Sequence, residues 1–321
     1  MREHARVHDA PLLHVKWFTD PSRHPTDYSL LLTLPVIAAL ALALAAAGVA
    51  YVIQHRAREP QIFASLERFA GLGPLALGAH VGLALMAAAV VGLLFVPSLR
   101  VHQDAEGMAL LVAEFVVGAA IAFGAATRPA AVGLALLGAI AMVPFSFESI
   151  LEQVHLLGAA FYLFIVGRGA IAVDRLFGQR RSIEHENAPT VALNVLRLAM
   201  GFGIAFNALT EKLLDPALSA QLLSERPELN VLRAVGVADP QFVWLAGLIE
   251  LAIGVVVMSG QLTRPVMAIG AVIFTSTLPL FGWLELLGHL PYYGMMLTLF
   301  LSPYPGSPRV KRQLRAGKLA A

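Results

Sequence analysis

Two pairs of acid and histidine stand at helical spacing in this sequence. Glu152 and His155 are three positions apart, and Glu285 and His289 are four positions apart, so each pair would share one face of a helix. A carboxylate beside an imidazole can ligate a metal ion or move a proton at a bound oxygen. Acids at such positions can also cap the first turn of a helix. The sequence is consistent with both interpretations.

Four further ionisable residues lie inside long apolar segments: His80, Glu114, Arg197 and Glu250. A charge within a bilayer costs at least about 2.5–3.5 kcal/mol on insertion scales, so such residues are candidates for function. We predict that Arg197 and Glu250 face each other, either as an ion pair that fixes helix packing or as a polar floor for a ligand. His80 and Glu114 differ in expected depth, so their pairing stays open, and His80 is either a proton relay or a structural histidine.

The segment that carries Arg197 ends at Glu211 and Lys212. The expected topology brings these two residues to the same membrane face as Glu152 and Glu285. This outer cluster completes the predicted ligand-binding set. No metal ion is assigned to it.

The chain is too apolar for a soluble protein. Of 321 residues, 58% are hydrophobic and 14% are Asp, Glu, Lys or Arg, whereas charged residues make up about 25% of soluble domains. The absence of cysteine excludes Cys-ligated iron–sulfur clusters. Haem is disfavoured because His80 is the one histidine well inside a span. A net charge of +2 does not suggest binding to nucleic acid.

The apolar segments predict an all-α, polytopic integral membrane protein with about nine transmembrane helices. The expected spans are residues 29–53, 71–99, 108–126, 129–147, 149–167, 190–210, 240–259, 264–282 and 286–303. Lys and Arg are more frequent in the loops on the C-terminal side, which places the C-terminus in the cytoplasm and the N-terminus outside. The expected location is a bacterial-type inner (plasma) membrane, with the lipid bilayer as the first partner.

The N-terminal tail contains four histidines, His4, His8, His14 and His24. Their spacing matches no strong metal-ligand pattern. Residues 14–18 are better interpreted as an amphipathic segment that lies in the outer membrane interface.

Residues 114–129 align without a gap on residues 250–265, at an offset of 136 positions. The shared residues are a glutamate, two glycines and a Thr-Arg-Pro turn. The repeat predicts two parallel four-helix bundles after one N-terminal helix. The expected divisions are a tail (1–28), the first helix with a cytoplasmic linker (29–70), the first repeat (71–170), a linker (171–189), the second repeat (190–303) and a basic cytoplasmic tail (304–321).

The second repeat resembles the DoxX/DoxD-like family of four-helix membrane proteins. The resemblance rests on Arg197-Leu-Ala-Met-Gly, on Glu211-Lys212-Leu, and on Glu250-Leu-Ala-Ile-Gly followed by Gly260 and Arg264. The first repeat departs from this pattern, since it lacks the Lys-Leu pair and has His80 near the place of Arg197. The resemblance implies two fused units and a part in membrane redox steps, such as that of the small subunit of a thiosulfate:quinone oxidoreductase.

Three functions are consistent with these features. The first is a membrane subunit of a redox system that binds quinone or another small apolar ligand through the intramembrane Glu, Arg and His residues; any enzymatic role would be as part of a quinone-linked oxidoreductase. The second is a non-catalytic partner or assembly factor for another membrane or periplasmic protein. The third is a transporter for a small molecule or ion.

Overall fold

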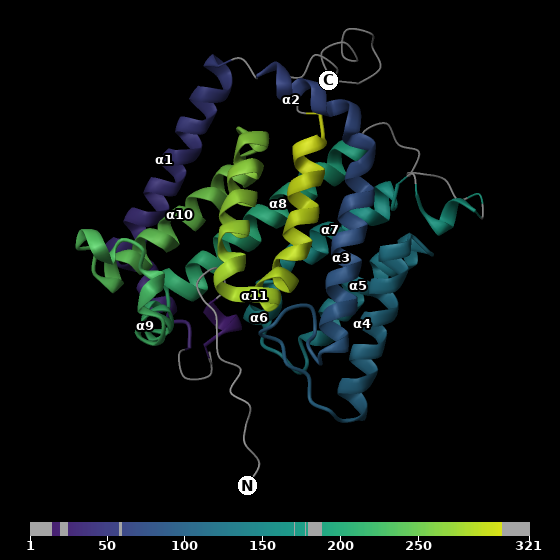
Figure 1. Ribbon diagram of the computed structural model, residues 1–321, viewed down its shortest axis with the longest axis horizontal. Coiled ribbons are helices and arrows are strands. Elements are labelled where there is room, and N and C mark those ends of the chain that lie inside the picture. The colour runs from purple at the N-terminus through teal and green to yellow at the C-terminus, as the bar shows by residue number, and fades with distance from the viewer. Residues whose placement is uncertain are drawn as a thin grey trace.

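The computed structural model describes residues 15–19, 25–57, 60–169, 171–176, 178 and 188–303, and these residues form an all-helical bundle (Figure 1). This confirms the predicted helical class. The described residues include no strand, only an isolated β-bridge between Leu93 and Arg100. The four N-terminal histidines and the basic tail after residue 303 lie outside the described residues.

Six helices in the described part of the chain are long and apolar enough to cross a membrane. They are α1 (Leu34–Arg56), the segment Gln61–Val90 that includes α2 (Gln61–Leu66) and α3 (Gly73–Val90), α4 (Ala105–Phe123), the segment Ala188–Leu213 that includes α8 (Ala188–Ala208), α10 (Asp239–Ser259) and α11 (Thr263–Leu301). Two shorter apolar helices are α5 (Thr127–Ala141) and α7 (Val154–Val166). The short helix α6 (Phe147–Leu151) lies between α5 and α7 in the sequence, and the short helix α9 (Pro216–Glu225) lies between α8 and α10.

Helix α11 is a hairpin of two legs. Gly282 has a φ of 70° and a ψ of −154°, which no helical residue adopts, and the chain reverses there. The legs contact each other along their length: the Arg264 side chain donates to the Phe300 carbonyl at 3.0 Å, and the Thr275 and Tyr293 hydroxyls are 3.2 Å apart. Figure 1 shows the two legs side by side.

The turn between α4 and α5 has the same geometry as the turn between α10 and α11. Ala126 and Leu262, 136 positions apart, both have left-handed backbones, with φ values of 51° and 48°. Arg128 donates to the Phe164 carbonyl at 3.0 Å, and Arg264 donates to the Phe300 carbonyl at the same distance. Equivalent residues therefore make equivalent contacts at the predicted offset.

Small residues allow the main helix pairs to approach closely. A Cβ atom added at Gly82 of α3 would stand 2.5 Å from the Gly118 carbonyl oxygen of α4. A Cβ added at Gly201 of α8 would stand 2.6 Å from the Gly254 carbonyl oxygen of α10. Close packing at small residues stabilises helix pairs that lack a hydrophobic driving force in lipid.

The structure corrects two predicted boundaries. The apolar run 71–99 is not one helix, because α3 ends at Val90 and the chain then turns through Phe95, whose φ is 66°. The segment between the expected spans 190–210 and 240–259 contains α9, whose first turn is capped by the Leu218 N–H donating to the Asp215 side chain.

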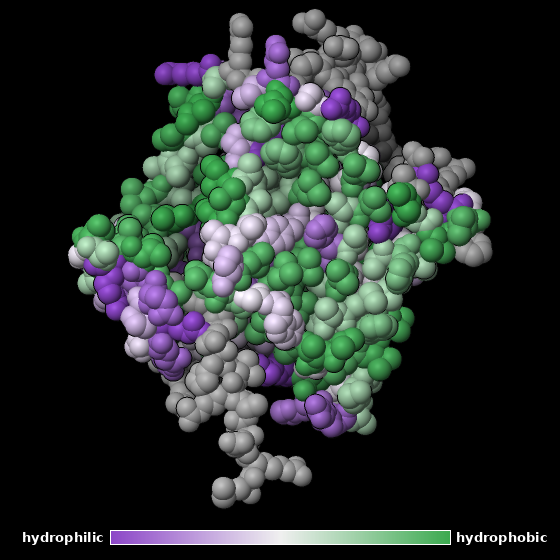
Figure 2. Space-filling model, in the orientation of Figure 1, coloured by the Kyte–Doolittle hydropathy of each residue, from purple (hydrophilic) through white to green (hydrophobic). Residues whose placement is uncertain are grey.

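The bundle has two distinct ends. Residues 15–19, hereafter the N-segment, dock at one end, beside the chain reversal of α11. Arg168, Arg197 and Arg264 lie at the opposite end, hereafter the arginine end, where Arg264 also pairs with Glu67 at 3.2 Å. Hydrophobic residues cover much of the face shown in Figure 2, and hydrophilic residues gather toward its edges.

Candidate functional site

The N-segment inserts into the protein. The Val15 N–H donates to the Glu211 carboxylate at 2.6 Å, and the Lys16 ammonium lies 2.5 Å from Glu152 and 2.8 Å from Glu148. Val15, Lys16 and Trp17 are all buried. Carboxylates of the protein therefore bind Val15 and Lys16, while the location of residues 14–18 in the outer membrane interface stays a prediction; His14 lies outside the described residues.

Trp17 anchors the N-segment against the second leg of α11. Its ring lies directly over Gly288, where an added Cβ would stand 2.0 Å from the indole. The ring centroid is 5.4 Å from that of His289, and the His289 ring is in turn stacked on Phe274 at 4.3 Å. The absence of a side chain at Gly288 is thus what makes room for the indole.

The two predicted acid–histidine pairs meet inside this part of the bundle. Glu285 and His289 are fully buried, with 3.6 Å between the carboxylate and the ring nitrogen. The His155 ring stacks on Tyr292 at 4.2 Å, so the first pair approaches the α11 leg that carries the second. Glu152 accepts from Lys16 at 2.5 Å and from Thr210 at 2.9 Å.

The two acids differ in their position relative to a helix start. The N-cap of α6 is Ser146, whose side chain accepts from the Ser149 N–H, and Glu152 stands at the C-cap of that helix. Glu285 stands three residues after the non-helical Gly282, in the first turn of the second leg of α11. The capping interpretation therefore does not hold for Glu152, whereas Glu285 occupies a position where a carboxylate can interact with a helix N-terminus.

Glu211 and Lys212 are both buried in a wider, π-helical turn that follows α8. Residues Leu209–Leu213 form a π-helical turn, a local expansion that is frequent at functional sites. Successive residues of an ordinary helix point about 100° apart, yet both side chains here are almost fully buried. Lys212 reaches Glu250 of α10 at 2.8 Å, and its side chain has no exposed surface.

The predicted ion pair between Arg197 and Glu250 is wrong. Arg197 donates to the carbonyls of Val257 and Met258 at 3.0 and 2.5 Å, which places it over the last turn of α10. Val257 lies about two helical turns beyond Glu250, roughly 10 Å along the axis. The guanidinium therefore satisfies free carbonyls at a helix C-terminus, and Lys212 takes its place beside Glu250.

The structure does not bring His80 and Glu114 together. Glu114 is fully buried and accepts from the Phe95 N–H at 2.7 Å, so it fixes the turn that follows α3. His80 is half-buried, contacts its own helix through the Ala76 carbonyl at 2.8 Å, and lies beside Gly294 of α11. The two residues occupy different faces of the α3–α4 pair.

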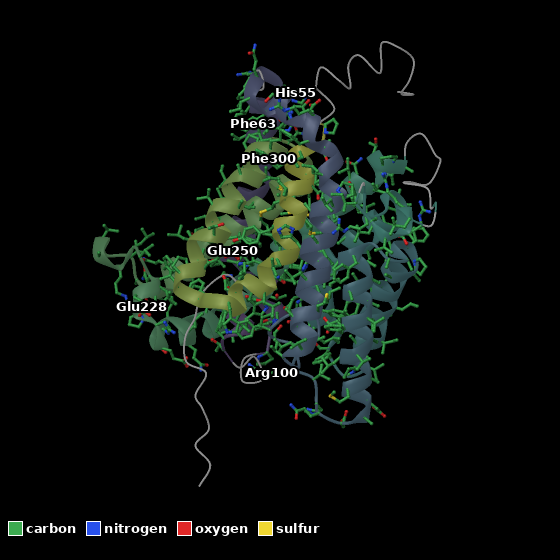
Figure 3. The ribbon with its side chains drawn as sticks, turned by 45° about the vertical axis from the view of Figure 1, so that its right-hand side comes forward. His55, Phe63, Arg100, Glu228, Glu250 and Phe300 are labelled. Carbon is green, nitrogen blue, oxygen red and sulfur yellow. The ribbon has the colours of Figure 1, made fainter. Side chains whose placement is uncertain are left out.

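An apolar cavity of about 340 Å³ lies between α8, α10 and α11. Its wall includes Met200, Phe242, Ala246, Met267 and Phe274, and Glu250 is the only titratable residue among the described residues that line it. The Glu250 side chain is 15% exposed, and this exposed part faces the cavity. Figure 3 shows Glu250 between Arg100, near one end of the molecule, and His55, near the other.

Glu148 joins the N-segment to a second, open groove of about 1040 Å³. It accepts hydrogen bonds from Lys16 at 2.8 Å, from Thr26 at 2.6 Å and from Tyr28 at 2.6 Å. Partial burial acts to raise the pKa of Glu148, but these bonds outweigh it and hold the pKa below its ordinary value. Burial and the bond to Glu148 raise the pKa of Tyr28 to about 12.

Lys16 stays charged despite its burial. Burial alone would lower the pKa of its ammonium, but the neighbouring carboxylates, Glu152 first among them, outweigh that effect and hold the pKa above its ordinary value. Sequence reasoning missed Lys16 and Trp17 as parts of the site. The available signal was an isolated Lys-Trp pair between apolar residues ahead of the first long apolar segment.

Comparison with known proteins gives no match to a family model, to a curated protein or to a solved structure. Within the described residues, no group of three His, Asp or Glu side chains has the geometry of a metal site. The buried cluster and the cavity are therefore the structural features that bear on function.

Proposed function

We propose that this protein is a membrane subunit of a redox system and binds quinone, or another small apolar ligand with one polar group, in the cavity between α8, α10 and α11. The observation that carries the proposal is the wall of this cavity, which is apolar except for Glu250. Small-molecule sites characteristically combine an apolar lining with a few fixed polar groups. Glu250 is itself oriented by Lys212 at 2.8 Å.

The quinone class follows from chemistry that Glu250 can supply. A quinone carries an apolar ring and tail that suit the cavity, and its carbonyl oxygens take up protons when the ring is reduced. A carboxyl group at the wall can donate a hydrogen bond or a proton to such an oxygen. The DoxX-like motifs around Arg197, Lys212 and Glu250 give independent support for this class, and the electron donor would be a separate redox or periplasmic partner.

We further propose that the chain crosses a bacterial plasma membrane nine times, with its N-terminus outside, as two parallel four-helix units after α1. The matched turns at Ala126 and Leu262 and the matched arginine contacts support the duplication. The two legs of α11 and the shorter helices α5 and α7 supply the crossings beyond the single long helices.

Ligand titration in lipid nanodiscs tests the proposed function. The probe is a short-tailed benzoquinone, and its reference is the same tail on a plain benzene ring; binding is measured by calorimetry. The quinone should bind more tightly than the reference. Ala246→Trp, which fills the cavity, should weaken binding of both compounds at least tenfold, whereas Glu250→Gln should weaken binding of the quinone alone.

The matched control is Val112→Trp, which adds the same indole to a position of α4 that is 58% exposed and lies outside the cavity. It should leave both affinities unchanged. Wild-type affinity in the Ala246→Trp variant would contradict the assignment of the cavity, and equal binding of the two probes would contradict the quinone class.

A further inference from the structure

The buried cluster connects the cavity to the open groove at the N-segment end. Starting at the groove, Lys16 bridges Glu148 and Glu152 at 2.8 and 2.5 Å. Thr210 then donates to Glu152 at 2.9 Å, and its chain neighbour Glu211 accepts from the Val15 N–H at 2.6 Å.

The same series of groups continues to the cavity wall. Glu211 and Lys212 are adjacent in the π-helical turn, and the Lys212 ammonium contacts Glu250 at 2.8 Å. Acids and amines therefore succeed one another from water to the cavity, each a group that can accept and release a proton.

The opposite direction offers no such series. Between Glu250 and the arginine end, the described cavity wall consists of apolar residues such as Ile253, Val257 and Met267. The nearest charge there is Arg197, whose guanidinium is held by the carbonyls at the end of α10. Arginine does not give up its proton in proteins, so it ends the path.

The elements packed against α10 carry different ionisable groups at its two ends. The π-helical turn presents Lys212 and Glu211, and α11 presents Glu285, whose charge interacts with that of Glu250. Helix α8 contributes Arg197 at the arginine end. The ionisable groups of α1, His55 and Arg56, stand in its last turn, also at that end.

We propose that Glu250 exchanges its proton with the N-segment end of the molecule, through Lys212, Glu211, Glu152 and Lys16, and not with the arginine end. This inference rests on the proposed function, for which it names the side that supplies protons to the ligand. In one transfer, the Lys212 ammonium gives a proton to the Glu250 carboxylate and becomes a neutral amine. Lys16 gives a proton to Glu152 and regains one from water in the groove, Glu152 passes its proton to Glu211, and Glu211 passes it to the Lys212 amine. One proton thus leaves the water of the groove and one arrives at Glu250, so charge is conserved and no electron moves.

Carbodiimide labelling tests the direction of exchange. Dicyclohexylcarbodiimide dissolves in lipid and forms a stable adduct with a protonated carboxyl group, which mass spectrometry locates at Glu250. The full-length protein is reconstituted in vesicles, its orientation is scored by proteolysis of the N-terminal tail, and the pH on each side is set separately. Labelling of Glu250 should increase severalfold when pH falls on the N-segment side and stay constant when it falls on the other side.

Two variants test the residues of the path. Glu152→Gln should slow the response of Glu250 labelling to a pH step at least tenfold. Thr210→Val, which keeps the shape and removes the hydroxyl, should slow it severalfold and provides the test if Glu152→Gln does not fold. Glu114→Gln, a buried acid outside the path, is the control and should leave the response unchanged.

Labelling that follows pH on the arginine side, or on both sides equally, would overturn the proposal, as would a wild-type response in Thr210→Val. Quinone titration in the same vesicles separates this inference from the proposed function. Quinone binding without one-sided labelling refutes the path alone, and one-sided labelling without quinone binding supports the path while refuting the ligand.

Discussion

Removal of Lys212 should destabilise the protein far more than removal of its partner Glu250. The Lys212 side chain has no exposed surface, and two carboxylates depend on its charge, the partly buried Glu250 at 2.8 Å and the adjacent, fully buried Glu211. Lys212→Met leaves both acids without this cation, and one-sided loss of a buried ion pair costs about 3–5 kcal/mol. Glu250→Gln leaves Lys212 beside Glu211 and keeps a side chain able to hydrogen-bond, so we expect a cost of about 1–2 kcal/mol.

The double variant distinguishes this explanation from a simple loss of packing. Lys212→Met combined with Glu250→Gln removes one charge of each sign, so it should recover at least half of the stability lost in Lys212→Met alone. The assay is equilibrium unfolding by SDS titration in mixed micelles, followed by circular dichroism. The control is Arg233→Met, which breaks an exposed ion pair with Asp239 and should change unfolding little. Equal stability of Lys212→Met and the wild type, or no recovery in the double variant, would refute the reasoning.

Three further predictions concern the N-segment and the arginine end. With Trp17 as the sole tryptophan, Gly288→Ala should shift its fluorescence to longer wavelength, because the new Cβ occupies the position of the indole; unchanged emission would contradict the docking. The pKa of Glu148 is lower in the folded state than its ordinary value. Glu148 therefore stabilises the docked N-segment fully above the ordinary glutamate pKa of about 4.3, and this stabilisation is lost as pH falls through the lowered pKa. The same shift of Trp17 emission should appear on acidification and be absent near neutral pH. Arg197→Met should lower the free energy of unfolding by about 1–2 kcal/mol, because the bonds to the α10 carbonyls are lost. In SDS unfolding, this loss should add to that of Glu250→Gln within about 0.5 kcal/mol. A larger departure from additivity would indicate that Arg197 and Glu250 interact directly, contrary to the structure.

The sequence was sufficient to predict the helices and the kinds of residue in the cluster. Each apolar run between residues 29 and 303 coincides with at least one helix, because hydropathy reports burial or lipid contact directly. The number of membrane crossings stays a prediction. Helices α5 and α7 are short, and the chain reversal at Gly282 does not by itself show whether each leg of α11 spans the bilayer.

The partners of the cluster could not be predicted, because they depend on register and reach. Arg197 and Glu250 are on neighbouring helices, but an offset of two turns separates them, and hydropathy contains no information about that offset. Lys212 reaches Glu250 from a π-helical turn, and neither hydropathy nor residue spacing indicates where such a turn forms. The burial of Lys16 depends on three acids from distant segments, none of which marks the N-segment in the sequence.

The docking of the N-segment has a consequence for the order of assembly. Trp17 is synthesised more than 250 residues before Gly288 and His289, against which it packs. The acids that bind Val15 and Lys16 come from the middle of the chain. Since synthesis proceeds from the N-terminus, the N-segment cannot dock until both the acids and the second leg of α11 have been made. Its docking therefore reports that this leg is in place.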